Sequence, residues 1–168
     1  MNFLGGGAQR LYWWMLKRAY GAQCVSQSGL QLEFVDIRVP ATRNPEEVRR
    51  VLADALQRIS IAKSGFGELV TSHLKVLAAA NVSKEVILPA ARVYMCSFDG
   101  AERTNGHYLA CLLIWAATSL RLSRDAAARE VVPDDEAIVR ACHDAQIRFV
   151  KQFPDWEQWV ETLGVDKG

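Results

Sequence analysis

Three residues that can form a thiol hydrolase occur in chain order: Cys24, His107 and Asp125. A cysteine nucleophile needs a histidine base within hydrogen-bonding reach and a third group that orients this base. A Cys-His-Asp hydrolase is therefore one hypothesis for the function. The three residues are far apart in the sequence, so only the fold can bring them together.

The motif Gly106-His107-Tyr108, followed by an apolar run, resembles the histidine box of some papain-like peptidases, including ubiquitin-specific ones. The resemblance implies that His107 is the base, and it covers three residues of 168. The sequence around Cys24 lacks the nucleophile signature of such enzymes. Residues 108–120 are rich in Ala and Leu, which favours a helix where these peptidases have a strand. We therefore favour an ordinary thiol at Cys24 and a helix start at His107.

The segment 8–20 carries a stronger signal, and the signal is for binding. It holds more aromatic surface than one helix face can bury, flanked by basic residues and no acidic ones. Trp, Tyr and Arg are the residues that dominate hot spots of protein interfaces. Burial inside the chain and contact with an anionic membrane surface are the alternatives. We predict a helix that binds a protein partner through Arg10, Tyr12, Trp13, Trp14, Lys17 and Arg18.

Metal, phosphate and DNA sites have weaker support. His107 and Cys111 are four residues apart and share a helix face, but no C-x-x-C or H-E-x-x-H motif occurs, so we expect neither metal nor cofactor. The stretch 63–67 matches neither the P-loop nor the dinucleotide fingerprint, and we interpret it as a turn between helices.

Residues 120–141 resemble a helix-turn-helix, but three acidic residues open the second helix and would repel phosphates. A nucleic-acid-associated subunit that contacts phosphates through the N-terminal half is a third hypothesis, and a binding protein is favoured over an enzyme.

Composition limits the class of protein. The chain is half apolar with a formal net charge of +1, which argues against a disordered chain and against binding driven by overall charge. Its length predicts a single domain, residues 1–168, with residues 1–7 as a flexible lead. Its longest apolar run, residues 108–119, is too short for a transmembrane segment. Four scattered cysteines and the lack of a signal-peptide pattern favour a cytoplasmic protein.

The predicted fold class is α+β and predominantly helical, with six or seven helices around a buried central helix; an all-α fold is the alternative. The clearest strand is predicted at 30–39, where apolar residues alternate. Segment 83–98 fits either short strands or a helix beginning at Pro89. Helices are expected at 8–20, from Pro45 to the break at 64–67, and at 68–80, 107–121, 124–131, 133–151 and from Asp155 onward.

Overall fold

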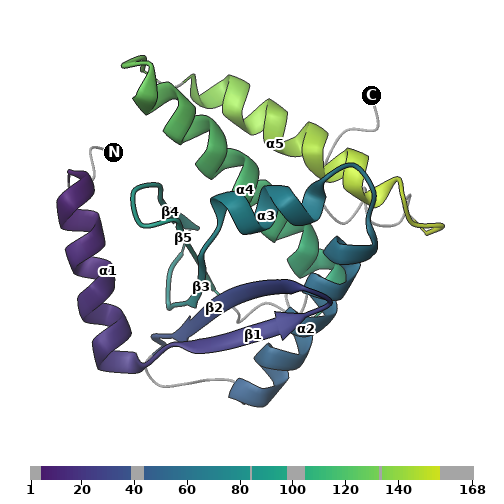
Figure 1. Cartoon of the computed structure of the whole chain (residues 1–168), viewed down its shortest axis with the longest axis horizontal. Coiled ribbons are helices and arrows are strands. Elements are labelled where there is room, and N and C mark those ends of the chain that lie inside the picture. The colour runs from purple at the N-terminus through teal and green to yellow at the C-terminus, as the bar shows by residue number, and fades with distance from the viewer. Residues whose placement is uncertain (1–4, 39–43, 84, 98–104, 133, 156–168) are drawn as a thin grey trace.

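The structure, a computed structural model, describes residues 5–38, 44–83, 85–97, 105–132 and 134–155. These residues form five helices and one five-stranded sheet, with strand order β1-β2-β3-β5-β4 (Figure 1). The helices are α1 (Gly6–Tyr20), α2 (Pro45–Ile61), α3 (Phe66–His73), α4 (Gly106–Ala128) and α5 (Asp135–Val150). The strands are β1 (Gln23–Gln27), β2 (Leu30–Asp36), β3 (Val76–Ala79), β4 (Val86–Leu88) and β5 (Val93–Cys96).

The centre of the sheet is parallel and apolar on both faces. Strands β2, β3 and β5 run parallel, and β1 and β4 pair antiparallel at the two edges. The register places Phe34, Leu77 and Tyr94 side by side on one face, with Val35 and Ala78 on the other. A sheet of this kind must be covered on both sides.

Helices cover the two faces unequally. Side chains of α2, α3, α4 and α5 form one core with the face that carries Phe34, whereas α1 is the one helix of the described residues that packs on the opposite face (Figure 1). Helices α4 and α5 pair antiparallel: Gln146 Nε2 donates a 3.0 Å hydrogen bond to the Cys111 carbonyl, and Cys142 Sγ lies 3.5 Å from the Trp115 carbonyl. This arrangement is an antiparallel helix pair, which differs from the near-perpendicular helices of a helix-turn-helix.

Local sequence signals place the helix starts. The Asn44 side chain accepts a 3.0 Å hydrogen bond from the Glu46 N–H, as its position before Pro45 predicts. The Asp134 side chain caps α5 in the same way. Asn105, rather than His107, caps α4, with 2.8 Å from its side-chain oxygen to the His107 nitrogen.

The α+β class with a helical majority is confirmed, and the all-α alternative is wrong. The described residues contain five helices instead of six or seven. Two predicted helices, 107–121 and 124–131, are one continuous α4, because no Gly or Pro interrupts them. The end of the predicted helix 68–80 is strand β3, and segment 83–98 contains two strands rather than a helix at Pro89.

The predicted burial of the helix that begins near His107 is confirmed, but its central position among the other helices is not. Helix α4 is one of four helices layered on one sheet face, and it packs against α2, α3 and α5. Helix α1 begins at Gly6, within the stretch predicted as a flexible lead. The predicted terminal helix containing Trp156 and Trp159 lies outside the described residues.

Gly106, at the start of α4, lies so close to Asp54 of α2 that no side chain fits between them. A Cβ at Gly106 would lie 2.0 Å from Asp54 Oδ2 and 2.7 Å from Asp54 Cβ, so a new Asp54 rotamer could not remove the clash. We expect Gly106→Ala to lower the free energy of unfolding by about 1–3 kcal/mol in urea titrations. Gly7→Ala in α1, where no atom lies within 4 Å of the new Cβ, is the control and should leave stability unchanged or slightly raised. Equal stability of Gly106→Ala and the parent would contradict this packing.

Candidate functional site: the outer face of helix α1

The inner face of α1 fixes the helix to the sheet. Trp13 is only 6% exposed and packs against apolar side chains of β2, β3, β4 and β5. Gln9 is also buried, and its Oε1 accepts a 3.2 Å hydrogen bond from the Ala90 N–H. Arg10 Nε donates to the Ala90 carbonyl at 3.3 Å. The helix is therefore held by one large indole and by polar contacts to the turn between β4 and β5.

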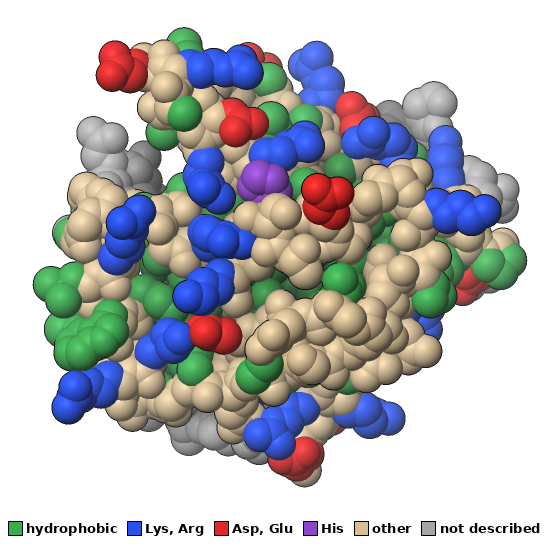
Figure 2. Space-filling model, in the orientation of Figure 1, with side chains coloured by type: hydrophobic (Ala, Val, Ile, Leu, Met, Phe, Trp, Pro, Cys, Tyr) green, Lys and Arg blue, Asp and Glu red, His purple; other side chains and the backbone are tan. Residues whose placement is uncertain are grey.

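The outer face of α1 carries a second apolar stripe. Leu11, Trp14 and Met15 follow the i, i+3, i+4 spacing that places side chains on one side of a helix. Their exposed fractions are 59%, 55% and 50%, and that of the adjacent Tyr12 is 42%. Figure 2 shows hydrophobic side chains gathered at the left edge of the molecule, where α1 lies. We call Leu11, Tyr12, Trp14 and Met15 the α1 outer patch.

The charges beside this patch are positive. No acidic residue occurs between Gly6 and Tyr20. The Arg18 guanidinium lies 5.5 Å from the centroid of the Trp14 ring, within cation–π range. Lys17 forms an ion pair with Glu33 of β2, so part of the positive charge is neutralised within the fold.

A cleft separates α1 from the turn between β4 and β5, with a volume of about 430 Å³. Two indoles line it together with four cations, and none of its lining residues in the described part of the chain is a carboxylate. Sequence reasoning missed Lys75 and Arg92, because nothing near either residue signals that the fold brings it beside α1. The lining residues include Trp13, Trp14, Arg10, Lys17, Lys75 and Arg92.

The structure divides the residues predicted to bind a partner into two groups. Trp13 points toward the sheet, so it mainly supports the helix and presents only a small exposed edge to the cleft. Tyr12, Trp14 and Arg18 are exposed, whereas Lys17 is partly buried. Adjacent residues on a helix point about 100° apart, which is why the sequence could not show that two neighbouring tryptophans have different environments.

The three residues of the thiol hydrolase hypothesis are not brought together. Cys24 is exposed on edge strand β1, where its Sγ lies 2.7 Å from Gln31 Nε2. His107 is in the first turn of α4 and Asp125 near its end, about 27 Å apart along the helix axis. Asp125 therefore cannot orient the His107 ring. His107 is completely buried, with no surface from which to act as a base toward a substrate.

The surroundings of His107 favour the neutral ring. Its ring packs 4.9 Å from the Phe153 ring, and its Nδ1 accepts from Arg58 Nη1 at 3.3 Å. Burial and the Arg58 charge lower the pKa of His107 from 6.5 to about 4, while Asp155 and Asp54 act in the opposite direction. An arginine can only donate, so the contact requires an unprotonated Nδ1.

This lowered pKa predicts a pH dependence of stability. The unfolded chain binds a proton at His107 below about pH 6.5 and the folded chain only below about pH 4, so stability is lost as the pH falls between these values. The contribution of His107 to the free energy of unfolding should drop by about 2 kcal/mol between about pH 7 and pH 5. Urea titrations of the parent and His107→Asn, whose Oδ1 can replace Nδ1 as the acceptor, measure this contribution. An identical pH dependence in both proteins would contradict it.

Thiol reactivity should separate the four cysteines. Cys96, Cys111 and Cys142 are buried, and burial raises the pKa values of Cys111 and Cys142 to about 12. Because the thiolate is the reactive form, we expect Ellman's reagent to titrate one thiol per native chain and all four in denaturant. Cys24→Ser should remove the native reaction. Rapid native reaction of a second thiol would show that the helical core opens.

Within the described residues, no three His, Cys, Asp or Glu side chains group as a metal site, and no helix is long and apolar enough to cross a membrane. Comparisons with models of protein families, with curated proteins and with solved structures find no match to this chain.

Proposed function

We propose that this protein binds another protein through the α1 outer patch. The observation that carries the proposal is that α1 buries one apolar face on the sheet and leaves a second apolar face in water. A partly exposed Trp14, with Tyr12 beside it and Arg18 over its ring, has the composition that dominates interface hot spots.

The surrounding charge defines the chemistry of the partner. Among the described residues that line the cleft beside Trp14, the charged ones are Arg10, Lys17, Lys75 and Arg92, and only Lys17 of these forms an ion pair, with Glu33. A complementary partner places apolar side chains on the outer patch and Asp or Glu side chains toward this cleft. We therefore propose an acidic, amphipathic protein segment as the ligand of α1.

A protein partner fits this surface better than an anionic membrane does. Stable attachment to a membrane needs either a long apolar face or a second signal such as a polybasic cluster. The outer patch extends over little more than one helical turn, from Leu11 to Met15. Lys17 is paired with Glu33, and Arg10 donates to the Ala90 carbonyl, so two of the three cations of α1 already interact with the fold.

The two tryptophans provide the first test, through stability. Trp13→Ala removes a buried indole and should lower the free energy of unfolding by about 3–5 kcal/mol. Trp14→Ala removes an exposed indole and its contact with Arg18, which should cost at most about 1 kcal/mol. Urea titrations of both variants measure the difference. A large loss of stability in Trp14→Ala would place that indole in the core and remove the basis of the proposal.

The second test measures binding. Selection from a displayed random-peptide library on the folded protein should enrich peptides that combine aromatic or aliphatic residues with Asp and Glu. A selected peptide should lose at least about tenfold in affinity for Trp14→Ala, which is the behaviour of a hot-spot residue. Val139→Ala, which alters an exposed apolar side chain of α5, is the control and should bind like the parent.

Other outcomes would contradict the proposal. Enriched peptides that bind Trp14→Ala as well as the parent would place the interface elsewhere. Trp14-dependent binding to anionic lipid vesicles, without enriched peptides, would assign the patch to a membrane surface. Self-association that Trp14→Ala abolishes would make a second copy of the chain the occupant.

A further inference from the structure

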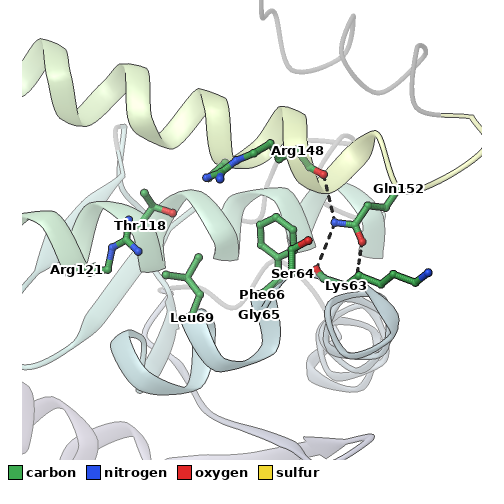
Figure 3. A pocket seen from close by; sticks show the side chains of 10 residues that line it. Lys63, Ser64, Gly65, Phe66, Leu69, Thr118, Arg121, Arg148 and Gln152 are labelled. Carbon is green, nitrogen blue, oxygen red and sulfur yellow. Dashed lines mark hydrogen bonds between the residues drawn. The ribbon is translucent and has the colours of Figure 1, made fainter.

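A second cavity lies on another part of the molecule, bounded by α3, α4 and α5. Its volume is about 490 Å³, within the range of about 300–1,000 Å³ that is usual for small-molecule sites. Phe66 and Leu69 of α3 supply apolar contacts, and Arg121 of α4 and Arg148 of α5 line the cavity from the neighbouring helices (Figure 3).

The charged side chains that line this cavity are all cations. In Figure 3 the Arg148 guanidinium extends over the cavity toward the side where Arg121 and Thr118 lie, and the Lys63 amine points away from them. Arg148 Nε donates to the carbonyl of Asp144 in its own helix at 3.3 Å. Among the described residues, no ion pair or side-chain hydrogen bond engages Arg121 or the terminal nitrogens of Arg148.

We propose that this cavity binds a phosphorylated small molecule that has an apolar or aromatic body. Arg121 and Arg148 contact the phosphate, and Phe66 and Leu69 contact the body. A guanidinium matches phosphate oxygens in bidentate geometry, which favours arginine pairs for this ligand class. Both guanidiniums carry positive charge, and a bound dianion compensates the charge of both.

The wider surroundings agree with an anionic ligand. Burial, followed by the charges of Arg124, Arg121 and Arg92, lowers the pKa of His73, which ends helix α3, whereas Asp125 opposes this effect. Three arginines and one aspartate therefore act on the histidine at this end of α3, and Arg121 is the one of them that also lines the cavity.

The turn before α3 contributes one wall of the cavity and is not a phosphate loop. Ser64 and Gly65 line the cavity, and helix α2 precedes them where a P-loop has a strand. This agrees with the sequence-based interpretation of residues 63–67 as a turn. The phosphate is assigned to the arginines, which lie on two other helices.

Calorimetric titrations with three probes test the assignment: phenyl phosphate, inorganic phosphate and benzoate. Phenyl phosphate should bind saturably, more tightly than inorganic phosphate because of its ring and more tightly than benzoate because of its charge. Arg121→Gln and Arg148→Gln should each weaken its binding at least about tenfold. Both arginines are exposed, so unfolding temperatures should confirm that these variants fold.

Arg140→Gln on α5 is the matched control, because it removes the same charge from an exposed position outside the cavity. It should change the affinity for phenyl phosphate by less than about twofold. Trp14→Ala should leave this affinity unchanged, which separates this site from the proposed protein interface. Absence of saturable binding, tighter binding of benzoate, or an equal loss in Arg140→Gln would overturn the assignment.

Discussion

Because Trp13 packs on the sheet, its side of α1 is buried, and only the outer side of α1 is available to bind other molecules. Strands β2, β3 and β5 carry apolar side chains on both faces of the sheet. Among the described residues, α1 is the one helix that covers the face opposite Phe34. One helix can turn only one side toward a sheet. Because Trp13 and Trp14 point about 100° apart, rotating the helix to bury Trp14 would bring Trp13 into water. The exposed patch is therefore a direct consequence of how the second sheet face is sealed.

Charge distribution distinguishes the two proposed sites, although the chain as a whole is nearly neutral. Beside α1 the cations surround exposed indole and aliphatic surface, so in the proposed complex apolar contact would supply the affinity and charge would select an acidic partner. In the cavity between α3, α4 and α5, the guanidiniums of Arg121 and Arg148 supply the principal contacts, and apolar surface selects the body of the ligand. Apolar contact would therefore be the main interaction at the α1 outer patch, and charge the main interaction in the cavity.

The parts of the fold that local chemistry specifies could be predicted from the sequence. The cap at Asn44 depends on the next few residues alone, and α2 begins at Pro45 as predicted, whereas α5, predicted from residue 133, begins at Asp135 with Asp134 as its cap. Strand β3 was missed because its four residues are buried on both faces, which removes the alternation that identifies a strand. Edge strand β1 was missed because it is mostly polar and exposed, so it has too few apolar residues to show an alternating pattern. The cleft cations Lys75 and Arg92 and the cavity pair Arg121 and Arg148 were not predictable, because only tertiary packing brings each set together.

The division of α1 into a sealed and an exposed face is the central claim, and hydroxyl-radical footprinting read by mass spectrometry tests it directly. In the free protein, Trp14 and Met15 should be oxidised rapidly and Trp13 should be protected to the level of core residues such as Tyr94. Equal modification of the two tryptophans would show that α1 is not fixed on the sheet. Protection of both would show that the outer face is already covered, and either result would contradict the account.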